Sequence, residues 1–173
     1  AKKENFTGKE AQIISLYSNG KISSFKFVLY GLGKKDDFDL FKLYKSVASS
    51  VKKVMAAKPV KIAFVIEEYW MKKYSVAKAV KATVESIKLA NYLFNKYKSE
   101  DDKNNKPFEE VFLCLSAPKL SQGEQGLEGG EIVSDAVNFA RDLINEPPEV
   151  TSPSYLAQKA LNIASGSNGN IKV

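Results

Sequence analysis

Two features of the composition limit the chemistry that this chain could perform: it lacks histidine and has a single cysteine. The 173 residues contain no histidine, which removes the commonest general base, the commonest metal ligand and any serine–histidine or cysteine–histidine pair. The single cysteine, Cys114, excludes an internal disulfide and a multi-cysteine metal site. Because Cys114 lies in the apolar run 111–115, we expect a small buried thiol rather than a nucleophile.

Three clusters of carboxylates are the remaining candidates for metal binding or acid–base work. They are Glu67-Glu68, Asp36-Asp37-Asp39 and Asp101-Asp102. The glutamate pair ends an expected strand, where adjacent side chains point in opposite directions and cannot form one paired site. Asp36 or Asp37 is placed to cap a helix, and Asp101-Asp102 lie in a polar loop. Capping and solvated roles are therefore favoured for all three clusters.

Two glycine-containing segments could bind phosphate. Gly31-Leu32-Gly33 lies between an expected strand and helix, but Asp36 stands where the dinucleotide pattern G-x-G-x-x-G needs its third glycine. We therefore expect a tight strand-to-helix turn there. Segment 121–130 holds four glycines and is predicted to be a loop before a helix. Glu124, Glu128 and Glu131 would repel an anion, and their spacing differs from that of a calcium loop.

The elements that position these residues alternate between strand and helix. Segments 10–18 and 21–30 read as strands joined by an Asn19-Gly20 hairpin turn. Apolar residues at helical spacing then predict a helix that ends before Pro59; they are Phe41, Tyr44, Val47, Ala48, Val51 and Met55. A strand at 60–66, a long helix at 74–97, a polar loop at 99–107 and a strand at 109–117 follow. Tyr69 and Trp70 are expected to pack at the edge of the core rather than to form a partner surface.

The last third of the chain is predicted to be mainly helical. A helix is expected at 131–144, ended by Pro147-Pro148, and Ser152 with Pro153 predicts the start of another. Residues 171–173 read as the start of a strand, so we expect a truncated further domain. The whole pattern predicts an α/β fold, a three-layer α/β/α sandwich with a mixed sheet.

The charge is unevenly distributed along the chain. The net charge of +6 is the sum of +11 over residues 1–106 and −5 over residues 107–173. Lysine supplies 25 of the 26 basic residues, so Arg141 alone could form the bidentate forks typical of phosphate and base recognition. A solvated lysine-rich surface is therefore favoured over a nucleic-acid site. Apolar runs are too short to span a bilayer, and we expect no membrane partner.

Three stretches together resemble the leucyl aminopeptidase (cytosol aminopeptidase) family. Segment 31–35 resembles part of the family's N-terminal domain, and segment 85–98 resembles its helix end with spaced aromatic residues and a closing Tyr97-Lys98. The most specific stretch is segment 138–148, Asn-Phe-Ala-Arg-Asp-Leu-Ile-Asn-Glu-Pro-Pro. Together with the later Thr151, Pro153, Tyr155, Leu156 and Ala157, it is similar to the junction between the family's two domains.

The resemblance implies a macro-domain-like N-terminal domain at 1–130, a connecting helix at 131–146 and the start of a catalytic domain at 147–173. Arg141 and Asp142 are interpreted as helix-end contacts. The parent enzyme would be a metalloexopeptidase, a protease and hydrolase of the cytoplasm with two divalent ions, manganese or zinc, in a hexamer. Its metal-ligand motifs do not occur in this sequence, so no catalytic, cofactor-binding or metal residue is assigned to the chain.

The sequence therefore leaves two hypotheses about the function. The first is a non-catalytic domain of a metal-dependent aminopeptidase, inactive alone, with a role in assembly or access and with the catalytic domain of the same polypeptide as its partner. The alternative is a binding module that takes a nucleotide such as ADP-ribose, or nucleic acid. Absence of peptidase turnover favours the first, and saturable binding favours the second.

Overall fold

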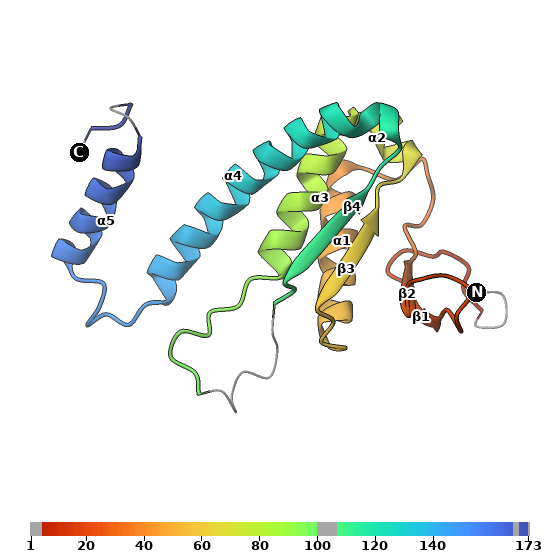
Figure 1. Cartoon of the computed structure of the whole chain (residues 1–173), viewed down its shortest axis with the longest axis horizontal. Helices are drawn as coiled ribbons and strands as arrows, with labels where there is room; N and C mark the ends of the chain where they lie inside the picture. The colour runs from red at the N-terminus through yellow and green to blue at the C-terminus, as the bar shows by residue number, and fades with distance from the viewer. Residues whose placement is uncertain (1–4, 100–106, 168–169, 173) are drawn as a thin grey trace. The chain divides into compact units, whose positions relative to one another are not determined.

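The computed structural model describes residues 5–99, 107–167 and 170–172. The chain divides into two compact units, Ala1–Val137 and Asn138–Val173, which are described separately below. Within these described ranges ten elements follow one another, and Figure 1 colours them from red to blue.

The first two strands form an antiparallel hairpin. β1 (Ile13–Tyr17) pairs with β2 (Lys26–Tyr30), with the first residue of one strand opposite the last of the other. Asn19 and Gly20 both have positive φ, 50° and 75°, the conformation that a tight hairpin turn requires at its two central residues. The predicted Asn19-Gly20 turn is therefore confirmed, while both strands are shorter than expected.

Helix α1 (Leu40–Met55) begins at a different cap from the one predicted. The side chain of Asp39 accepts a hydrogen bond of 2.7 Å from the backbone N–H of Lys42. Asp39 has the extended backbone typical of an N-cap, so the prediction of Asp36 or Asp37 as the cap was wrong by two or three residues.

The apolar stripe of α1 faces the core as predicted, with one exception. Its buried apolar residues are Leu43, Val47, Val51 and Met55. Phe41, which was expected on this stripe, is exposed. Phe41 lies two positions before Leu43, and this spacing places the two side chains on different sides of the helix.

Strands β3 (Lys61–Val65) and β4 (Glu110–Cys114) form a parallel pair in which Val65 lies opposite Cys114. Alternate residues of the pair pack against the core helices; they are Ile62, Phe64 and Leu113. Figure 1 shows α1 and α3 on the same side of this sheet. The opposite face, which includes Val65 and Phe112, is exposed. Cys114 is also exposed, so the prediction of a buried thiol was wrong, because this sheet has helices against one face.

The long helix predicted at 74–97 is shorter, Val76–Ala90, and a further helix that was not predicted precedes it at Glu68–Tyr74. α2 (Glu68–Tyr74) and α3 (Val76–Ala90) are separated by Ser75, whose φ of 73° cannot belong to a continuous right-handed helix. α3 ends at Asn91, whose side-chain oxygen accepts a hydrogen bond of 3.0 Å from Phe108 N. Residues 92–97 therefore lie beyond the helix. Of the predicted loop at 99–107, residues 100–106 lie outside the described residues.

The glycine-rich segment 121–130 is helical rather than a loop. After a short 3-10 turn (Ala117–Lys119), α4 runs from Leu120 to Asn145 without a break. Gly126 and Gly130 lie against α3: a β-carbon on Gly126 would come within 2.4 Å of the Ala77 carbonyl oxygen. Close packing of the two helices therefore outweighs the low helix propensity of glycine, which explains why the loop prediction failed.

The second unit contains the end of α4 and helix α5 (Pro153–Gly166). The hydroxyl of Ser152 accepts a hydrogen bond of 3.3 Å from Tyr155 N, and Pro153 stands in the first turn, so the predicted helix start is confirmed. Residues 171–172 are not in a strand, contrary to expectation, and Val173 lies outside the described residues.

Helices and strands are therefore mixed, which agrees with an α/β class. The strands of the described residues form two separate two-stranded sheets, one antiparallel and one parallel. This differs from the single mixed sheet that was predicted.

Candidate functional site

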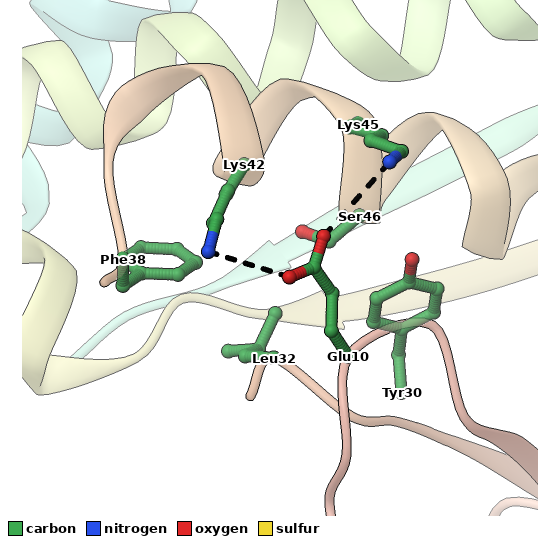
Figure 2. Close-up of a pocket in the computed structure, with 7 residues that line it drawn as sticks. All are labelled: Glu10, Tyr30, Leu32, Phe38, Lys42, Lys45 and Ser46. Carbon is green, nitrogen blue, oxygen red and sulfur yellow. Dashed lines mark ion pairs between the residues drawn. The ribbon is translucent and has the colours of Figure 1, made fainter. Parts of the chain in front are cut away.

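A small cleft lies where the hairpin meets α1. Figure 2 shows its lining: Glu10, Tyr30 and Leu32 come from the hairpin region, Phe38 lies just before α1, and Lys42, Lys45 and Ser46 come from α1. Its volume of ≈ 10 Å³ is about the space that one water molecule needs. The cleft is therefore too small for a substrate or a nucleotide.

Charged groups converge at this cleft. The carboxylate of Glu10 points toward both lysines, with Oε2 3.3 Å from Lys42 Nζ and Oε1 3.9 Å from Lys45 Nζ. The lysines are three residues apart on α1, a spacing that puts both on one side of the helix. The Ser46 hydroxyl donates to the Leu43 carbonyl at 2.9 Å within the helix, so it is not directed at a reacting group. This arrangement holds the hairpin against α1 and offers no nucleophile–base pair.

A second polar cluster lies between α1 and α3. Glu85 is 7% exposed, and its Oε2 accepts a hydrogen bond from the Tyr44 hydroxyl. Its other oxygen lies 3.9 Å from Lys81 Nζ. Burial, followed by the hydrogen bond and the negative charge of Glu85, raises the pKa of Tyr44 to about 12. The carboxylate is occupied by these two partners, so the cluster joins two helices rather than forming a reactive site.

The Gly31-Leu32-Gly33 segment is not the tight strand-to-helix turn that was predicted: its backbone is hydrogen-bonded to residues 8–12, the chain turns at residues 36–37, and α1 begins only at Leu40. The backbone N–H of Gly31 donates to the Gln12 carbonyl at 2.7 Å, and that of Gly33 donates to the Gly8 carbonyl at 3.0 Å. A β-carbon on Gly31 would lie 2.0 Å from the Lys9 carbonyl oxygen, so no other residue fits there. The N–H groups that would bind a phosphate are used within the hairpin region.

The other predicted candidates are structural. Glu67 is the N-cap residue of α2, and Glu68 forms an ion pair with Lys119, which lowers the pKa of the Glu68 carboxyl. Trp70 is buried and stacks on Phe38 with ring centroids 5.9 Å apart, which confirms its packing role. Asp101 and Asp102 lie outside the described residues.

The described residues contain neither a metal-binding cluster nor a membrane-spanning helix. Within residues 5–99, 107–167 and 170–172, no group of three cysteine or acidic side chains is placed to hold a metal ion. Over the same ranges, no helix is both long enough and apolar enough to cross a bilayer.

The junction segment 138–148 forms the end of α4 and the turn that follows it. Arg141 Nη1 donates to the Asn138 side chain at 3.2 Å, one turn earlier on the helix. The backbone N–H and the hydroxyl of Thr151 both donate to the Pro147 carbonyl at 3.1 Å. This segment therefore sets where α4 ends and where α5 begins.

Two of these groupings were not predicted from the sequence. The cleft joins Glu10 to lysines more than thirty residues away, and no local pattern signals such a pair. The burial of Glu85 had a weak signal, because it is the one charged residue in the otherwise uncharged run 82–87.

Comparisons with known proteins agree on one family. Residues 1–101 match the family model described as "Cytosol aminopeptidase family, N-terminal domain". The chain is 30% identical to a probable cytosol aminopeptidase of Alkaliphilus oremlandii over 98% of its own length and 34% of the relative's. It is 33% identical to a probable cytosol aminopeptidase of Aquifex aeolicus over 95% of its length and 31% of the relative's. The chain thus spans about a third of the length of the curated relatives it matches.

Solved structures show the same relationship at the level of fold. A mutant of tomato leucine aminopeptidase superposes with a TM-score of 0.74 at 22% identity, covering 95% of this chain and 31% of the other. The bottromycin maturation enzyme BotP gives a TM-score of 0.74 at 18% identity, covering 96% of this chain and 34% of its own. Since the matched family model covers more than half of the sequence, the chain belongs to the cytosol aminopeptidase family.

Proposed function

We propose that this chain is the non-catalytic N-terminal part of a metal-dependent aminopeptidase, together with the start of its catalytic domain. The observation that carries the proposal is the match of residues 1–101 to the family's N-terminal domain. The chain's coverage of about a third of its relatives agrees with this role. Neither polar cluster described above pairs a nucleophile with a base, so they offer no competing enzymatic function.

The metal ions of such an enzyme would be held outside this chain. The described residues do not fit a pair of manganese or zinc ions, since no three carboxylate or thiol groups converge. No step of the peptidase reaction is therefore assigned to these side chains. The parent protein would be a cytoplasmic hexamer that removes N-terminal residues from peptides, and this domain would act in assembly or in access to the active site.

Exposed apolar side chains support the proposal that the last part of the chain opens a larger domain. In the second unit, Ile144 is 81% exposed, and α5 also exposes Leu156, Leu161 and Ile163. A helix with apolar residues on the outside is expected to pack against another part of the protein. We assign that contact to the rest of the catalytic domain of the same polypeptide.

The open face of the β3–β4 sheet supports a macro-like, three-layer fold in the whole protein. Parallel strands are normally covered on both faces, but Val65 and Phe112 are exposed on the face away from α1 and α3. In the proposed fold, a second layer covers this face of the β3–β4 sheet.

The test is hydrolysis of leucine p-nitroanilide by the purified 173-residue chain, with and without manganese or zinc. We expect no turnover from this chain and turnover from a full-length relative measured alongside it. Metal-dependent turnover by the chain alone would contradict the proposal. The alternative of a nucleotide-binding module is not favoured, because the N–H groups of Gly31 and Gly33 already donate to the carbonyl groups of Gln12 and Gly8.

A further inference from the structure

The loop end of the hairpin presents large apolar side chains to solvent. We call residues 17–26 the hairpin tip. Within it, Tyr17 is 60% exposed, Ile22 is 54% exposed and Phe25 is 78% exposed. Isolated exposed apolar residues are common, but three within ten residues at one turn form a small apolar surface.

This apolar surface is held in place by contacts within the tip. The rings of Tyr17 and Phe25 pack edge to face, with centroids 5.4 Å apart and planes at 73°. The backbone N–H of Ser18 donates to the Phe25 carbonyl at 3.1 Å, and that of Lys21 donates to the Ser18 carbonyl at 3.1 Å. These contacts fix the two rings relative to each other, so a partner that binds them loses little side-chain conformational entropy at Tyr17 and Phe25.

The charge of the tip indicates the chemistry of its partner. Lys21 and Lys26 lie in the tip, which contains no acidic residue. The ammonium of Lys26 lies 5.4 Å from the centroid of the Tyr17 ring, so positive charge and aromatic surface are adjacent. Lysine is depleted in protein–protein interfaces, whereas lysine next to aromatic residues is typical of surfaces that bind anionic bilayers.

We propose that the hairpin tip binds the surface of an anionic lipid bilayer. Phe25, Ile22 and the Tyr17 ring would enter the boundary between headgroups and acyl chains, while Lys21 and Lys26 contact lipid phosphates. The expectation of no membrane partner was drawn from the shortness of the apolar runs, which concerns spanning segments and not surface binding. This inference does not depend on the proposed aminopeptidase function.

The experiment is co-sedimentation of the 173-residue chain with large unilamellar vesicles. One set contains phosphatidylcholine and phosphatidylglycerol in a two-to-one ratio, and the other contains phosphatidylcholine alone. We expect binding to the anionic vesicles that weakens as salt is raised. Phe25→Ser should reduce the partition coefficient about tenfold or more, because the transfer of one phenyl ring is lost. The double variant Lys21→Gln/Lys26→Gln should also bind less.

Phe41→Ser is the matched control, since Phe41 is 74% exposed on α1 and lies outside the tip. It should bind as the wild type does, and circular dichroism should show that all variants are folded. Absence of wild-type binding would overturn the proposal. Equal binding by Phe25→Ser and the wild type would also overturn it, because attraction would then come from the lysine-rich surface as a whole. An equal loss in Phe41→Ser would contradict the assignment to the tip.

Discussion

At the scale of single residues, the buried carboxylate of Glu85 constrains how α1 packs on α3. Its two partners come from different positions: the Tyr44 hydroxyl reaches across from α1, and Lys81 lies one turn away on the same helix. A buried carboxylate that loses a hydrogen-bond donor retains its desolvation cost without compensation. The cluster therefore couples the packing of α1 on α3 to the presence of one hydroxyl group.

Tyr44→Phe should lower the free energy of unfolding by about 1–3 kcal/mol at neutral pH, because Glu85 loses its donor. The pKa of Tyr44 is about 12 in the folded protein, above the ordinary 10.0, so its contribution is complete below pH 10 and is lost as the pH rises toward 12. Urea unfolding of both proteins between pH 8 and pH 11 measures the difference. A stability gap that stays constant up to pH 11 would contradict this assignment.

At the scale of elements, α3 and α4 approach closely because glycines occupy one side of α4. Gly123, Gly126 and Gly130 are buried, and their spacing of three and four residues places them on one face of the helix. A β-carbon on Gly130 would lie 2.8 Å from the Val84 β-carbon. Lys88 Nζ and Asp135 Oδ1, 2.6 Å apart, join the same two helices further along.

Gly126→Ala should destabilise the protein by about 1–3 kcal/mol, because its β-carbon would clash with backbone and side-chain atoms of α3. Gly129→Ala is the matched control on the same helix. Its β-carbon would meet only Lys81 Cδ, at 3.7 Å, among atoms outside its own helix, so the higher helix propensity of alanine should add up to about 1 kcal/mol. Thermal and urea unfolding measure both. Equal effects of the two substitutions would rule out close packing at Gly126.

These glycines also show what the sequence could and could not predict. Local signals were sufficient for the Asn19-Gly20 turn and for the Ser152-Pro153 helix start, because the determining groups are neighbours in the chain. The helical state of segment 121–130 depends on contact with α3, about fifty residues earlier, which outweighs the intrinsic preference of glycine. The cleft around Glu10 could not be predicted from the sequence either, because its ion pairs join residues that are distant in the chain.

At the scale of the whole molecule, the exposed apolar residues of α5 distinguish an isolated fragment from part of a larger enzyme. Leu161 and Ile163 are exposed on this helix. Burial of one large apolar side chain contributes about 1.5–3 kcal/mol to the free energy of unfolding. Side chains that are covered only by a longer polypeptide make this contribution only when that polypeptide is present. The same substitution should therefore have different effects in the two contexts.

Leu161→Ser/Ile163→Ser should change the unfolding free energy of the 173-residue chain by less than about 1 kcal/mol, because both side chains already contact water. In the full-length enzyme the same double substitution should cost several kcal/mol or lower the temperature of unfolding markedly, since the proposed domain contact would lose two apolar anchors. Gln158→Ser, on the same helix and also exposed, is the control and should be nearly neutral in both. Calorimetry of the six proteins measures the contrast. If the double variant were neutral in the full-length enzyme as well, α5 would not be the surface on which the catalytic domain packs.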